Sequence, residues 1–141
     1  MNLKNIALIS LALLAGPAFA EDSYFDGSEP LLCTMMTGAI CDITGCSEAD
    51  RANDLGGAKH LVLDFKRDRI KSPESGLQAE IARTSQVDNR LFVQGVNDSS
   101  EDQTDARSWT ITIADPNGTM TLTVAGEEMA LVSFGACAPI K

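Results

Sequence analysis

Residues 107–136 read RSWTITIADPNGTMTLTVAGEEMALVSFGA and contain three β-compatible runs separated by two short turns. Along the first two runs every second residue is apolar, and these positions are Trp109, Ile111, Ile113, Met120, Leu122 and Val124. A period of two is typical of β-strands with one buried face. Pro, Asn and Gly within residues 115–118, and Gly126 after the second run, favour turns. The stretch therefore predicts an antiparallel meander of three strands at residues 107–114, 119–125 and 128–136.

The rest of the chain repeats this pattern in shorter runs, at the spacing of about 8 to 12 residues that all-β domains show. Asp88 and Asn89 favour a hairpin turn because both residue types tolerate a positive φ. One helical turn is predicted within residues 47–53. Further strands are predicted at residues 31–40, 60–65, 78–86 and 90–96, with a short one at Ile70.

The predicted fold class is all-β, with about eight short, mostly antiparallel strands. No helix long enough to cover a sheet is predicted, so the apolar faces must be buried by sandwiching two sheets or by closing one sheet on itself. We expect residues 31–141 to form a single domain, as a small meander barrel or a strongly curved sheet. A sandwich remains the alternative, and whether a barrel interior is filled or hollow stays open.

The first twenty residues have the pattern of a signal peptide. Lys4 provides the positive start, residues 6–15 are apolar, and Ala18 and Ala20 supply small residues at the cleavage positions. Cleavage is predicted after Ala20, which implies a periplasmic or secreted protein without a membrane span. An uncleaved anchor at residues 1–20 is the alternative. Residues 21–30 are expected to form a polar, mobile N-terminal segment.

The chain has four cysteines, and an even number in an exported protein predicts two disulfides. Three pairings are possible. A pairing of Cys41 with Cys46 is favoured because residues 42–45 resemble a turn, and Cys33 with Cys137 would then tie the first strand to the last. A metal or thiol-redox site is the less favoured interpretation, because no Cys-x-x-Cys pair is present and the chain has one histidine.

The composition excludes nucleic-acid binding. The formal net charge is -9, from 20 acidic and 11 basic residues. Binding to phosphate requires clustered basic residues, so this charge opposes it, whereas cationic partners are attracted.

Catalytic candidates are few. His60 is the single histidine of the chain and would have to serve any serine or cysteine nucleophile. Paired carboxylates could serve a glycosidase, but the sequence places no two of them at a defined separation. The acidic candidates are Asp42, Glu48, Asp50, Asp54, Asp64, Glu80, Asp115, Glu127 and Glu128. A solvated acidic surface is the favoured interpretation of these residues, and no cofactor is implied.

Residues 97–105 read NDSSEDQTD and collect many oxygen ligands in one loop. Such ligands suit calcium, but the stretch lacks the glycine and the final glutamate of an EF-hand loop. A flexible acidic loop is the favoured interpretation, and calcium binding the alternative.

Short motifs along the mature chain resemble a family of small exported proteobacterial proteins of unknown function. They are Cys41 and Cys46 around an acidic turn, LVLDF (61–65), RLFVQGV (90–96), RSWT (107–110), GTMT (118–121) and VSFGACAP (132–139). The resemblance implies a bacterial periplasmic setting and no particular activity.

Two functions of different classes are therefore expected. The first is a monomeric binding module for an apolar ligand or a basic protein of the cell envelope. Met35, Met36 and the surroundings of Trp109 are the candidate lining of an apolar cavity, because methionine adapts to irregular apolar shapes. The alternative is a small envelope hydrolase that uses acidic residues near His60.

Overall fold

The computed structural model describes residues 23–49, 57–97 and 106–140. The predicted signal peptide at 1–20 and all but the first residue of the acidic loop at 97–105 lie outside the described residues. Within the described ranges there are ten strands and no helix. No helix in these ranges is long and apolar enough to cross a membrane.

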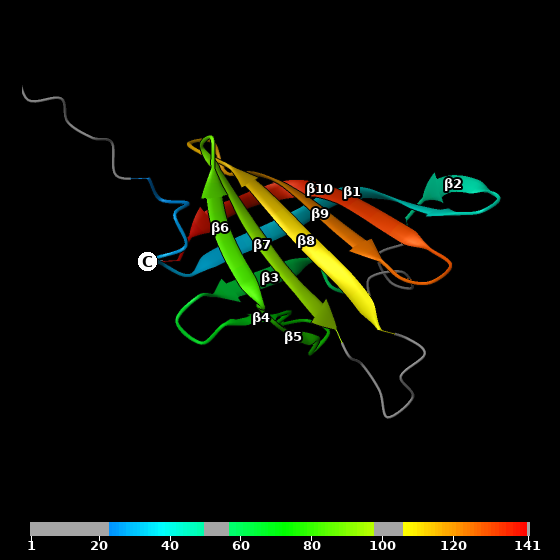
Figure 1. Cartoon of the computed structure of the whole chain (residues 1–141), viewed down its shortest axis with the longest axis horizontal. Helices are drawn as coiled ribbons and strands as arrows, with labels where there is room; N and C mark the ends of the chain where they lie inside the picture. Colours follow the sequence, from blue (N-terminus) through cyan, green and yellow to red (C-terminus); the bar gives the residue numbers. More distant parts are fainter. Residues whose placement is uncertain (1–22, 50–56, 98–105, 141) are drawn as a thin grey trace, which may run out of the picture.

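The ten strands form one antiparallel sheet in the order β5-β4-β3-β1-β10-β9-β8-β7-β6, with β2 attached to β1. The sheet curls so that the strands from β6 to β10 arch over β3, β4 and β5 (Figure 1). The predicted all-β class and strongly curved sheet are confirmed as a curled half-barrel. The strands are β1 (Leu31–Asp42), β2 (Gly45–Glu48), β3 (His60–Asp64), β4 (Arg69–Lys71), β5 (Gln78–Glu80), β6 (Arg83–Val87), β7 (Arg90–Asn97), β8 (Arg107–Ala114), β9 (Thr119–Ala125) and β10 (Ala130–Pro139).

The predicted meander of the last third is present as β8, β9 and β10, which pair in sequence order. The hairpin turn between β6 and β7 also forms where expected, with φ values of 46° at Asp88 and 58° at Asn89. Both elements depend on local alternation and turn chemistry, which a sequence displays directly.

The single strand predicted at 78–86 is wrong, because the structure interrupts it at Ile81 and Ala82. The Ile81 amide donates to the Asp68 carbonyl at 2.8 Å, next to β4, and the Ala82 amide donates to the Gln94 carbonyl on β7 at 2.9 Å. One bent segment thus pairs with both ends of the sheet. A straight strand could not follow both partners, so the bend separates β5 from β6.

The helical turn predicted within 47–53 is contradicted where the chain is described. Ser47 and Glu48 belong to β2, and Ser47 is paired with Ile40 of β1. Local propensity favoured a turn of helix there, but pairing with β1 across a disulfide prevails.

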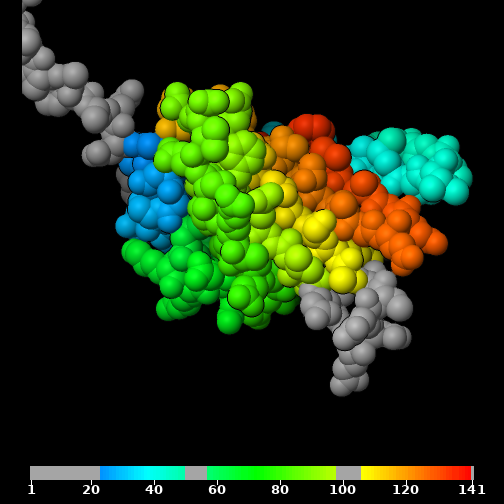
Figure 2. Space-filling model, in the orientation of Figure 1, coloured from blue at the N-terminus to red at the C-terminus, as the bar shows by residue number. Residues whose placement is uncertain are grey.

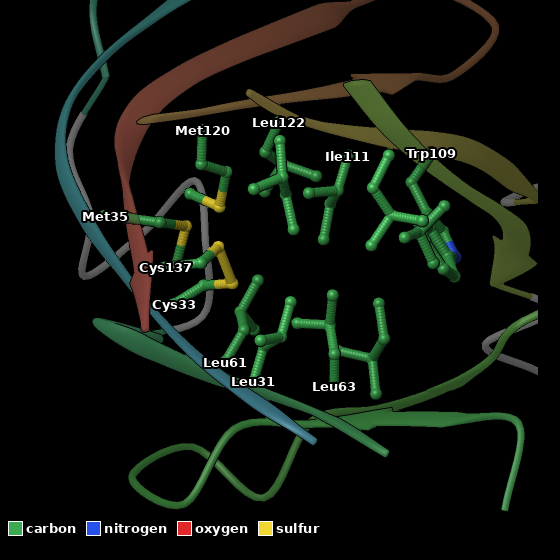
Figure 3. Packing of buried hydrophobic residues seen from close by; sticks show 14 of the residues in the cluster. Leu31, Cys33, Met35, Leu61, Leu63, Trp109, Ile111, Met120, Leu122 and Cys137 are labelled. Atoms are coloured by element: carbon green, nitrogen blue, oxygen red, sulfur yellow. A yellow bond between two sulfur atoms is a disulfide. The ribbon is translucent and has the colours of Figure 1, made fainter. Parts of the chain in front are cut away.

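Apolar side chains fill the interior of the half-barrel. Figure 3 shows Leu31, Leu61 and Leu63 on one wall facing Ile111 and Leu122 on the other. The alternating apolar positions of β8 are buried, with Ile111 and Ile113 fully so and Trp109 6% exposed. These inward faces are the ones that the sequence pattern predicted.

The start of the described chain packs against this core. Residues 21–30 were expected to be mobile, yet Phe25 is only 5% exposed and belongs to the core cluster. A Cβ atom added at Gly118 would lie 2.7 Å from the Phe25 ring, which shows how closely the two residues approach. Burial of one aromatic ring can anchor a segment whose other residues are polar.

Both favoured disulfides are present. Cys33 and Cys137 are directly opposite each other on β1 and β10, and their bond lies inside the core (Figure 3). Cys41 and Cys46 are opposite each other on β1 and β2, at the exposed end of the sheet. Two disulfides indicate an oxidising compartment.

Candidate functional site

An open groove lies at the end of the sheet, between the β1–β2 hairpin and the β9–β10 turn. Both segments project beyond the body of the molecule, as the cyan and orange lobes of Figure 2 show. The groove has a volume of about 640 Å³. Its lining combines the half-buried apolar side chains Ile40 and Met129 with the carboxylates of Asp42, Glu127 and Glu128. This lining can hold a partner group that is both cationic and partly apolar.

The β1–β2 hairpin is built by Asp42. Its Oδ1 accepts hydrogen bonds from the Thr44 amide at 2.7 Å, the Thr44 hydroxyl at 2.6 Å and the Gly45 amide at 3.2 Å. The bond from the Thr44 hydroxyl is the main reason why the pKa of Asp42 lies below its usual value. Asp42 therefore stays ionised in the groove, and its carboxylate also closes the turn.

The turn between β1 and β2 requires a glycine at position 45, where β2 begins. Gly45 has φ of 143°, a backbone conformation that residues with a side chain rarely adopt. All four residues of β2 are exposed, so the hairpin is held by its disulfide, its ladder and Asp42 rather than by the core.

The opposite side of the groove is the β9–β10 turn, closed by a bond of 2.9 Å from the Gly126 amide to the Met129 carbonyl. Glu127 and Glu128 at its tip are exposed. Arg107, at the start of β8, also lines the groove. Three carboxylates against one guanidinium leave the groove negative, so cations are favoured there.

His60 lies elsewhere, on β3. Its Nδ1 is hydrogen-bonded to Oε1 of Glu74, and its backbone amide donates to Oε2 of Glu74 at 3.3 Å. The hydroxyl of Ser72 donates to the same oxygen at 3.1 Å. Glu74 thus lies between the imidazole and the hydroxyl, whereas an activated serine needs the imidazole between hydroxyl and acid. Ser72 is also only 2% exposed. The hydrogen bonds of Glu74 to His60 and Ser72 therefore form a structural clamp, which links β3 to the loop after β4.

The clamp predicts an acid dependence of stability. The hydrogen bond from His60 lowers the pKa of Glu74 to about 2 from its usual 4.5. A carboxyl whose pKa is lower in the folded state stabilises the fold fully above its unfolded pKa and loses this contribution as the pH falls. We therefore expect the Glu74→Gln variant to lose less stability than the parent protein between about pH 4.5 and pH 2.

The measurement is urea unfolding at a series of pH values. His60→Ala removes the main cause of the shift and should flatten the same part of the curve. A Glu74→Gln curve parallel to that of the parent protein would show that the clamp does not act on stability. Comparison of the hydrolytic activity of His60→Ala with that of the parent protein would also test the hydrolase hypothesis, since unchanged activity would remove His60 from it.

The acidic candidates from the sequence are scattered, apart from the three in the groove. Asp64 is paired with Arg67 at 2.8 Å, Glu48 lies on β2, Glu80 ends β5 and Asp115 follows β8. Asp50 and Asp54 lie outside the described residues. Within the described ranges no three His, Cys, Asp or Glu residues come together in a way that could hold a metal ion.

The candidate cavity residues are also separated. Met35 is buried in the core at 1% exposure, but its neighbour Met36 is the extra residue at a bulge of β1 and is 62% exposed. Sequence reasoning missed Glu74, Arg107 and Met129, because the surroundings of each depend on segments that are distant along the chain.

The fold and the groove define a disulfide-tied all-β half-barrel with an acidic groove at one end. No family model, no curated protein and no solved structure matches the chain. The family resemblance seen in the sequence therefore stays a prediction.

Proposed function

We propose that the protein is a binding module of the periplasm or the extracellular space that holds a basic protein partner. The groove between the β1–β2 hairpin and the β9–β10 turn is the site. The observation that carries the proposal is the convergence of Asp42, Glu127 and Glu128 on this one open groove. The two disulfides support this location, because disulfides persist in oxidising compartments such as the periplasm and the extracellular space.

An apolar small molecule inside the barrel has less support. The inward positions of β1, β3, β8 and β9 are occupied by large side chains that approach one another across the interior (Figure 3). Packing of this kind leaves few voids larger than a water molecule. The basic protein is therefore the partner class that the geometry favours.

The charge of the whole chain supports the same partner. A net charge of -9 attracts cationic proteins over several ångströms and speeds their encounter with the groove. Such steering is screened by salt, because the Debye length is about 8 Å at physiological ionic strength. Binding is expected to weaken steeply as salt is added.

The test compares two double variants that remove the same charge. Glu127→Gln with Glu128→Gln changes the groove, and Asp68→Asn with Asp88→Asn changes two distant turns. Asp68 and Asp88 have φ of 49° and 46°, which asparagine adopts readily. We expect the groove variant to bind the partner about three- to thirtyfold more weakly, and the turn variant to bind almost as the parent protein does.

The protein is immobilised, exposed to the cell-envelope extract at low salt, and eluted with a salt gradient. The retained proteins are identified by mass spectrometry and their affinities measured with each variant. Retention of no basic protein would overturn the proposal. Equal weakening by the two variants would also overturn it, since binding would then follow total charge rather than the groove.

A further inference from the structure

The tip of the β1–β2 hairpin presents an apolar side chain almost completely to solvent. Ile43 is 99% exposed, whereas the next most exposed large hydrophobic residues among those described are Tyr24 at 65% and Met36 at 62%. Tyr24 has a polar hydroxyl, and Met36 lies on the sheet surface at a bulge. Ile43 lies in the turn between β1 and β2, and this hairpin extends beyond the rest of the sheet (Figure 1).

The hairpin that carries Ile43 is cross-linked covalently, although all four residues of β2 are exposed. The Cys41–Cys46 disulfide links the two strands just below the tip, and the three hydrogen bonds to Asp42 close the turn around Ile43 and Thr44. A covalently closed turn loses little conformational entropy when a partner binds it. An exposed aliphatic side chain on such a turn does not stabilise the fold, but it is available for burial in the surface of a partner protein.

The charges around Ile43 indicate the kind of surface that would bury it. Asp42 precedes Ile43, and the rim carboxylates Glu127 and Glu128 line the same groove as Thr44 beside it. An apolar centre with a charged rim is the usual anatomy of a protein interface.

We infer that Ile43 is the anchor of the interface and enters an apolar pocket that is rimmed by lysine or arginine on the partner protein. This inference rests on the proposed function and names the contact that gives the partner its specificity. The carboxylates of the groove attract and orient the basic rim, and the burial of Ile43 holds the complex.

A lipid surface fits the hairpin poorly. The carboxylates beside Ile43 would be repelled by anionic lipids, which attract basic rather than acidic segments. A single aliphatic side chain also supplies too little apolar area for stable membrane attachment, which takes a second signal even with an acyl chain. A lipid surface is therefore the less favoured partner, and sedimentation with vesicles tests for it directly.

The test uses Ile43→Ser and a matched control, Val87→Ser. Val87 is 53% exposed and ends β6 at a different hairpin, so both variants remove one exposed aliphatic side chain and leave the charge unchanged. The parent protein and both variants are immobilised against the same envelope extract at low salt, and the retained basic proteins are quantified. Those retained proteins, once purified, are the probes for affinity measurement. Urea unfolding confirms that both variants keep the parent's stability.

We expect Ile43→Ser to lower the affinity for a retained basic protein by at least about tenfold, and Val87→Ser to leave it unchanged. A photo-reactive benzoylphenylalanine placed at Ser47, which lines the groove, should cross-link to an apolar peptide of the same protein. The same residue placed at Val87 should not.

The outcomes separate this inference from the proposed function. If the parent protein retains no basic protein, the proposed function fails and this inference fails with it. If Ile43→Ser retains the same basic proteins with unchanged affinity, only the anchor is overturned. Sedimentation of the parent protein, but not of Ile43→Ser, with vesicles of phosphatidylglycerol and phosphatidylethanolamine would overturn it in favour of a membrane contact.

Discussion

Replacement of both Cys33 and Cys137 by alanine is expected to lower the free energy of unfolding by about 5 kcal/mol. The bond closes a loop with a sequence separation of 104, and cross-linking of so long a loop strongly restricts the unfolded chain. Domains of this size are stable by only about 5 to 15 kcal/mol. The double variant should therefore be close to unfolded at physiological temperature.

The matched control is replacement of Cys41 and Cys46 by alanine. This bond spans a sequence separation of 5, so the expected loss is about 2 kcal/mol. The measurement is the urea midpoint of each variant, with near-ultraviolet circular dichroism to report core packing. Equal shifts of the midpoint in the two double variants would contradict the loop-length argument.

The second large effect is expected at Gly95. Gly95 is paired with Trp109 across β7 and β8 and is buried. A Cβ atom at this position would lie 2.6 Å from Cε2 of Trp109 and still closer to the backbone carbonyl oxygen of Glu80. Real Cβ atoms essentially never come within 3.0 Å of a heavy atom outside their own residue and its two chain neighbours. The carbonyl belongs to β5, so the clash falls where the two ends of the sheet meet.

We expect Gly95→Ala to destabilise the protein by about 3 kcal/mol, the upper part of the usual range for overpacking. Gly126→Ala is the control, because its added Cβ would meet its nearest atom, Cγ of Arg107, at an ordinary 3.6 Å. That variant should stay within about 0.5 kcal/mol of the parent protein. Fluorescence of Trp109, the single tryptophan of the chain, should shift to the red in Gly95→Ala alone. An unshifted emission with an unchanged urea midpoint would show that β5 does not pack against Gly95.

Much of the fold could be predicted from short patterns. Alternation along residues 107–125 predicted which side chains of β8 and β9 enter the core, and Ile111 and Leu122 do so. Asp88 and Asn89 predicted the β6–β7 turn, which has the positive φ values that these residues tolerate. The turn-like residues between Cys41 and Cys46 led to the correct pairing of all four cysteines.

The candidate site was less accessible to the same reasoning. The sequence offered nine acidic residues without a way to choose among them, and the structure brings three of them to one groove. The partner of His60 proved to be Glu74, which lies 14 positions away in a turn that carried no catalytic signal. Neither the grouping of the three carboxylates nor the pairing of His60 with Glu74 depends on local sequence.

Local patterns of the sequence account for most of the strands, for the β6–β7 turn and for the favoured disulfide pairing, because these features depend on the period of two and on backbone preferences. They failed at β2 and at the break between β5 and β6. Contacts between distant segments produce the bend at Ile81 and Ala82, the clamp at His60 and the groove beside the β1–β2 hairpin. Each of these depends on which distant segments the curvature of the sheet brings together, since one bent segment must pair with β4 and β7 at once. The curvature is a property of the whole sheet, and no single stretch of the chain encodes it.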